Sequence, residues 1–127
     1  MAGTLTITTL NASSGVLATQ NGMTGICKAW VNFNGSGGAI RDSFNVSSIT
    51  VNGTGDYTVN FTTAMPNANY SAAITGNWAA SPGAYADPNN AFAPYGQAPT
   101  TSTLRVGTRS SSAFFDYAYV FVQVFSS

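Results

Sequence analysis

The chain has 127 residues, with four basic and four acidic side chains, no histidine and a formal net charge of zero. The length fits a single domain, and the content of 44% hydrophobic and 13% aromatic residues excludes a disordered chain. A neutral chain lacks the basic face that binding to nucleic acid or to an anionic membrane surface requires.

Charged residues make up only 6% of the chain, against about 25% in typical globular domains. The cores of protein–protein interfaces are similarly depleted in charge and enriched in aromatic residues. We therefore expect much of the surface to be buried between subunits of a homo-oligomer. The alternative is a monomer with a polar, neutral surface of Ser, Thr, Asn and Gly.

Residues 4–10 alternate apolar side chains, among them Leu5 and Ile7, with threonines, which predicts a β-strand. This strand could join the main sheet or form an arm that pairs with a neighbouring subunit. We assign residues 1–24 to this N-terminal strand or docking arm and residues 25–127 to one domain. The first ten residues lack the basic start and unbroken apolar core of a signal peptide, so we expect synthesis in a cytoplasm.

Residues 26–34 alternate in a second strand pattern. The predicted core face consists of Cys27, Ala29, Val31 and Phe33, and the opposite face of Ile26, Lys28, Trp30, Asn32 and Asn34. Trp30 on the partly polar face is a candidate contact for a subunit or ligand, or else it covers the edge of the core. Cys27 is the only cysteine, so no intrachain disulfide forms, and we expect a buried, inert thiol.

Three more strand segments come next, at residues 39–46, 49–51 and 56–62, and the last two are joined by the hairpin signature Asn52-Gly53-Thr54-Gly55. In residues 56–62, the side chains of Tyr57, Val59 and Phe61 alternate with polar ones, which predicts one buried face.

The C-terminal half contains strand patterns at residues 70–78, 102–108 and 116–125. The last pattern is apolar on both faces, which is typical of a central strand in a sandwich or of a strand packed against another chain. With no helical periodicity, the whole pattern predicts an antiparallel, jelly-roll-like β-sandwich of seven or eight strands. The candidate subunit-interface residues are Leu5, Ile7, Trp30, Tyr117, Tyr119 and Phe121.

Residues 79–101 form a long segment that is rich in proline and in aromatic residues. A long irregular connection in a small domain is often functional, and aromatic rings with amide side chains suit stacking on sugars and hydrogen bonding to hydroxyls. The candidate ligand-binding residues are Tyr85, Asn89, Asn90, Phe92, Tyr95 and Gln97. Alternatively, the aromatic residues pack the segment onto its own domain or onto a neighbour.

The residues needed for catalysis are scarce. Without histidine the usual general base and the commonest metal ligand are missing, and each of the four aspartates has a structural interpretation. Asp42 follows Arg41 and suggests a surface ion pair, Asp56 and Asp87 lie in turn sequences, and Asp116 opens the last strand pattern. We therefore expect no enzymatic activity, no metal site and no cofactor.

The block from Lys28 to Thr63, KAWVNFNGSGGAIRDSFNVSSITVNGTGDYTVNFTT, and the opening MAGTLTITTL closely resemble sequences in proteins of tailed bacteriophages, especially phages of cyanobacteria and marine bacteria. There the block occurs in short virion proteins and near the C-terminal ends of tail-fibre-like proteins, and the resemblance is weak from Ala64 to Ser127. It implies a virion protein without enzymatic chemistry.

The interpretation that we favour from this resemblance is a homotrimeric tail-fibre head that contacts other virion proteins and binds a host surface glycan. The alternative is a capsid decoration or cement protein that stabilises the phage head, and an enzymatic depolymerase is the least favoured. Because the block consists of strand patterns and glycine turns, we interpret it as scaffold and place recognition around residues 85–95.

Overall fold

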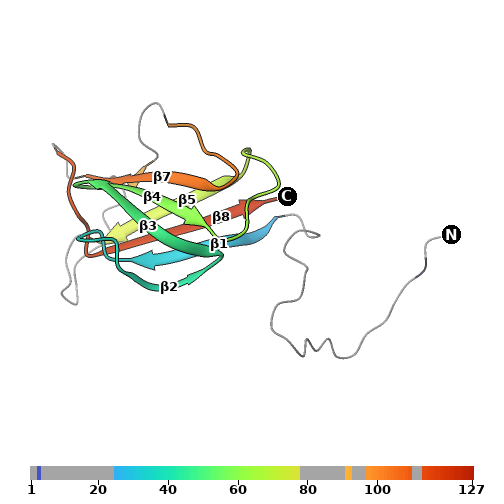
Figure 1. The fold of residues 1–127 in the computed structure, drawn as a ribbon, viewed down its shortest axis with the longest axis horizontal. Helices are drawn as coiled ribbons and strands as arrows, with labels where there is room; N and C mark the ends of the chain where they lie inside the picture. The colour runs from blue at the N-terminus through green and yellow to red at the C-terminus, as the bar shows by residue number, and fades with distance from the viewer. Residues whose placement is uncertain (1–2, 4–24, 78–90, 93–96, 110–112) are drawn as a thin grey trace.

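The computed structural model describes residues 3, 25–77, 91–92, 97–109 and 113–127. Within them the chain is an antiparallel β-sandwich of two four-stranded sheets, as the sequence predicted (Figure 1). The strands are β1 (Ile26–Phe33), β2 (Ile40–Phe44), β3 (Val46–Gly53), β4 (Asp56–Phe61), β5 (Ser71–Asn77), β6 (Ala91–Phe92), β7 (Thr103–Thr108) and β8 (Tyr119–Ser126). Sheet A has the order β2-β1-β8-β5, and sheet B has the order β3-β4-β7-β6.

The core lies between the two sheets and is built from alternate residues of the inner strands. The buried apolar side chains include Ala29, Val31, Phe33, Tyr57, Val59, Phe61, Leu104, Val106, Val120, Val122 and Val124. The alternation of β4 is confirmed, because Tyr57, Val59 and Phe61 are buried and the residues between them are half-buried. The rings of Phe33 and Tyr57 meet edge to face across the core, 5.1 Å between centroids.

Strand β8 is a central strand, as its two apolar faces predicted. It pairs with β1 on one side and with β5 on the other. Val120, Val122 and Val124 point into the core, so the residues between them must lie on the outer face of sheet A. The position of this strand thus determines which aromatic side chains remain outside the core.

Asn45 forms the corner where the chain passes from β2 in sheet A to β3 in sheet B. It has a positive φ of 55°, a conformation that asparagine tolerates better than most residues. Its Nδ2 donates to the carbonyl oxygens of Lys28 and Thr63, each at 3.0 Å, and its Oδ1 accepts from the Thr63 amide at 2.7 Å. These bonds hold the corner, the start of β1 and the end of β4 together.

Some predicted boundaries were wrong. The segments expected at 39–46 and 49–51 are instead β2, which ends at Phe44, and the eight-residue β3, which begins at Val46. The last strand begins at Tyr119 rather than at residue 116. The segment 79–101, expected to be irregular, contains the short strand β6, which pairs with β7.

The prediction for the faces of β1 was also wrong at two residues. The register with β8 shifts between Cys27 and Ala29, which is a β-bulge, and such a bulge places an extra residue in one strand and redirects a side chain. Lys28 is therefore buried next to Ala29, whereas Cys27 is only half-buried. Ala29, Val31 and Phe33 lie in the core as expected.

Tyr117 was expected at a subunit interface, but it is 2% exposed within its own chain. Its hydroxyl donates to the Arg109 carbonyl oxygen at 2.9 Å, and its own carbonyl oxygen accepts from the Gly35 amide at 2.8 Å. The residue precedes β8 and packs at the end of the sandwich, so its side chain is part of the core. Leu5 and Ile7, with the proposed arm, lie outside the described residues.

Candidate binding face

The outer face of sheet B is polar, and its side chains bond to one another. Asn60 of β4 donates to the hydroxyl oxygens of Ser48 and Thr50 on β3, at 3.1 and 3.0 Å. Asn52 donates to Thr58 Oγ1 at 2.9 Å. In such cross-strand pairs the donors and acceptors of the side chains bond to one another, which stabilises the sheet. Exposing these polar side chains to water costs little free energy.

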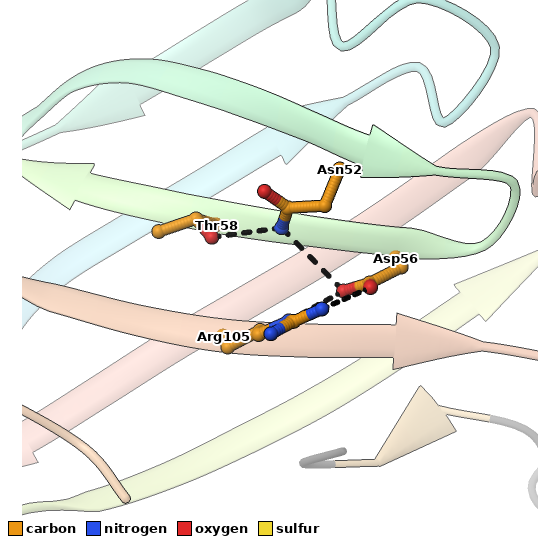
Figure 2. A network of polar contacts seen from close by, with 4 residues as sticks. All are labelled: Asn52, Asp56, Thr58 and Arg105. Carbon is orange, nitrogen blue, oxygen red and sulfur yellow. Dashed lines mark hydrogen bonds and ion pairs between the residues drawn. The ribbon is translucent and has the colours of Figure 1, made fainter. Parts of the chain in front are cut away.

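Figure 2 shows the ion pair that completes this face, between Arg105 of β7 and Asp56 of β4. The Arg105 Nε donates to Asp56 Oδ1 at 2.8 Å, and its Nη2 also bonds Oδ2. Hydrogen bonding from Arg105 lowers the pKa of Asp56 below its usual value. Asp56 was expected to serve the turn, and its role as the partner of Arg105 was not foreseen.

The outer face of sheet A is different, because aromatic rings cover it. We call the outward side chains Trp30 of β1 and Tyr119, Phe121 and Phe125 of β8 the aromatic face. Trp30 is 36% exposed and Phe125 is 38% exposed, although both belong to the class of side chains with the most apolar surface to bury. The burial pattern of β8, in which every second residue is buried, explains why the intervening rings point outward.

An open groove of about 520 Å³ lies in the aromatic face. Its lining includes Cys27, Trp30, Asn32, Phe121, Gln123 and Phe125. The strand register explains this grouping, since Trp30 pairs with Gln123 and Asn32 pairs with Phe121, and paired residues of antiparallel strands lie side by side on one face. The groove therefore combines apolar rings with two amide side chains, and none of the described residues that line it carries a carboxylate or a basic group.

Arg41 borders the aromatic face and contacts one of its rings, that of Tyr119. Its guanidinium lies 4.1 Å from the centroid of the Tyr119 ring, and its Nη2 donates to the Ala118 carbonyl oxygen at 2.8 Å. Tyr119 in turn stacks on Phe121, with centroids 6.2 Å apart and an angle of 13° between the rings. The expected surface ion pair with Asp42 is replaced by this cation–π contact, while Asp42 accepts a hydrogen bond from the Ser43 amide.

The chemistry available at this face is contact and stacking. Flat rings pack well against apolar side chains or sugar rings, and the Asn32 and Gln123 amides can donate and accept hydrogen bonds. Across the part of the chain that the structure describes, no three His, Cys, Asp or Glu side chains are grouped as metal ligands would be. In the same residues no helix has the length and apolarity needed to cross a membrane.

The predicted interface residues Trp30, Tyr119 and Phe121 lie together on the aromatic face. Phe125, Gln123 and Asn32 belong to the same face and were not among the candidates. The signal for Phe125 was present, because it is in phase with Phe121 along β8.

The candidate ligand-binding residues are mostly not described. Tyr85, Asn89, Asn90 and Tyr95 lie outside the described residues, Phe92 is in β6, and Gln97 is exposed.

Comparisons of the chain with protein-family models, with curated protein sequences and with solved structures found no match.

Proposed function

We propose that this chain is a structural protein of a tailed-bacteriophage virion that assembles as a homotrimer through its aromatic face and forms the head of a tail fibre. The observation that carries the proposal is the contrast between the two outer faces. Sheet B presents side chains that are satisfied by one another, as in Asn60 with Ser48. Sheet A presents Trp30 and Phe125, each more than one-third exposed.

A second copy of the chain suits the aromatic face for two reasons. Interface cores are rich in aromatic residues and poor in charge, and the groove lining has this composition. Contiguous exposed apolar patches on soluble proteins mark sites of association. The charge-poor surface of the whole chain supports the same interpretation, because repulsion between like charges would not oppose assembly.

The assignment to a phage virion rests on the resemblance of the block from Lys28 to Thr63. In the fold this block supplies β1 and β2 of sheet A and β3 and β4 of sheet B, which is half of the scaffold. Proteins that share the block would share these strands and differ in the chain after β4. We therefore assign contact with a host surface glycan to residues 79–101, in the part of the chain where the resemblance is weak.

Light scattering on the purified chain tests the assembly. We expect about three times the 13.1 kDa mass of one chain, and we expect the double variant Trp30→Ser/Phe125→Ser to dissociate to monomers. The matched control is Val51→Ser, because Val51 is 42% exposed on the edge strand β3 of the other sheet. A wild-type monomer at high protein concentration contradicts the proposed trimer.

Location and copy number in purified virions test the role in the particle. A few copies at the tail support the fibre head, whereas hundreds of copies on the shell favour the alternative, a capsid decoration protein. Replacing Tyr85, Phe92 and Tyr95 with Ala should abolish adsorption to host cells while particles remain intact. Unchanged adsorption, with heads that burst more easily, contradicts the host-binding role.

A further inference from the structure

Strand β5 forms one edge of sheet A, because the strand order ends with it. Its seven residues, Ser71–Asn77, carry no charge and include no proline. They pair with β8 from Ser71 to Asn77 without a register shift. The outer backbone N–H and C=O groups of such a long, regular edge strand can template pairing with a further strand.

The other edge strands each have a feature that discourages pairing. Strand β2 carries Arg41 and Asp42, β3 shifts its register with β4 at two places, and β6 has only two residues. Charges, bulges and short length are the means by which proteins protect the edges of their sheets. Among the strands that the structure describes, β5 is the edge strand that is long, regular and uncharged.

The core side of β5 is also incompletely covered. Ala72 pairs with Val124, and Ile74 pairs with Val122. Paired residues share one face of a sheet, so Ala72 and Ile74 face inward with these valines. Both valines are 1% exposed, whereas Ala72 is exposed and Ile74 is only half-buried. The sandwich is therefore open along its β5 side, and apolar side chains beside β5 would cover Ile74.

We propose that residues 4–10 of the same chain add to the edge of β5 as a fifth strand of sheet A. This segment has seven uncharged residues, like β5, and its alternation is that of a strand. Leu5 and Ile7 are in phase, so both would lie on one face of the added strand. With that face inward they cover Ile74, and the threonines between them lie on the outer surface.

The path of the chain allows this pairing within one molecule. The Gly25 amide donates to the Ser126 carbonyl oxygen at 3.2 Å, at the end of sheet A where β5 begins (Figure 1). In an antiparallel pairing Leu10 lies beside Ser71, about 15 Å and three strand spacings from the start of β1. Residues 11–24 can span about 46 Å. Short hinges favour exchange of strands between chains, so this long connection favours closure within the chain.

Hydrogen exchange measured by mass spectrometry tests the added strand. Every second residue of β5 directs its N–H away from β8, and we expect these amides to be protected in the wild type. Leu5→Asp/Ile7→Asp places two charges on the inner face, so it should release the strand and speed exchange of these amides at least about ten-fold. The matched control is Thr6→Asp/Thr8→Asp, which adds the same charge on the outer face and should keep the protection. Continued protection of β4 shows that each variant is folded.

NMR of the wild type provides a measurement that does not depend on the folding of any variant. We expect nuclear Overhauser contacts between residues 4–10 and residues 71–77. In a sample refolded from a mixture of ¹⁵N-labelled and ¹³C-labelled chains, these contacts should arise within one chain.

Contacts between differently labelled chains would assign the strand to a neighbouring copy and overturn the proposal. The absence of contacts would overturn it as well, and so would β5 exchange that is equal in the wild type and in a folded Leu5→Asp/Ile7→Asp. The added strand lies at the edge of sheet A and not on its aromatic face, so these outcomes are independent of the proposed trimer.

Discussion

Asp116 Oδ1 accepts a hydrogen bond from the Tyr57 hydroxyl at 2.6 Å and a second from the Gly55 amide at 2.7 Å. Tyr57 is fully buried, and burial together with its hydrogen bond to Asp116 raises the pKa of its phenol. A single carboxylate thus joins the β3–β4 hairpin to the chain that enters β8. This bond connects the two sheets at one end of the sandwich.

Removal of this carboxylate should destabilise the fold. Asp116→Ala leaves the buried Tyr57 hydroxyl and the Gly55 amide without their acceptor, at a cost of about 2 kcal/mol in the free energy of unfolding. Asp116→Asn keeps a carbonyl oxygen that can accept both bonds, so we expect a smaller loss. Urea unfolding of the three proteins measures the difference, and equal stability of wild type and Asp116→Ala would refute the structural role.

The two glycines of the hairpin turn should differ sharply in their tolerance of a side chain. Gly55 has a φ of +66°, and a Cβ there would lie 2.2 Å from the Thr108 carbonyl oxygen. Gly53→Ala is the matched control, because no atom lies within 4 Å of its added Cβ. We expect Gly55→Ala to lose about 3 kcal/mol or more, or to fail to fold, and Gly53→Ala to stay within about 1 kcal/mol of the wild type. Urea unfolding of both variants tests this, and similar stabilities would show that the turn conformation is not constrained.

The sequence predicted those parts of the fold that depend on local alternation. Tyr57, Val59 and Phe61 identified the buried face of β4, because period-two patterning reflects burial on one side of a sheet. The bulge at Cys27–Ala29 was not predictable in this way. One extra residue leaves the apolar spacing of Ala29, Val31 and Phe33 unchanged, so the burial of Lys28 had no local signal.

The sequence pattern also could not predict contacts between residues that are far apart in the chain. The partner of Asp116 is 59 residues away, and the partner of Asp56 is 49 residues away. Each aspartate has an adequate local interpretation, and only the sheet order brings the true partners together. Trp30 and Phe121, which the sequence proposed as interface residues, both line the groove. That Gln123 lies beside them followed only from the pairing of β1 with β8.

The Asp56–Arg105 ion pair should make stability depend on pH in the acidic range. Because the pKa of Asp56 is lower in the folded state, its contribution is fully present above the unfolded value of about 3.9. It is lost as the pH falls through the folded pKa, since the unfolded state then binds the proton more readily. The free energy of unfolding at a series of pH values should fall less steeply for Asp56→Asn than for the wild type.

The control for this ion pair is the same pH series measured at high salt concentration. Both side chains are partly exposed, so the contribution is modest and should be reduced by screening. An acid-dependent loss of stability that is identical in wild type and Asp56→Asn would contradict the prediction.

Tyr70 should confer a dependence of stability on alkaline pH, with the opposite sign. Its hydroxyl donates to the carbonyl oxygens of Thr100 and Thr103, each at 3.0 Å, and burial raises its pKa to about 12. The unfolded tyrosine ionises near pH 10, so the stabilising contribution is complete below that pH and is lost as the pH rises towards 12. After allowance for the partial exposure of the side chain, we expect a loss on the order of 1 kcal/mol in the free energy of unfolding.

Tyr70→Phe is less stable at neutral pH because it lacks both hydrogen bonds, but it should lose less stability between pH 10 and 12. Urea unfolding across this range, with phenolate absorbance recorded in parallel, measures how steeply the free energy of unfolding falls with pH in the wild type and in Tyr70→Phe. Equal slopes in the two proteins would rule out a contribution from Tyr70.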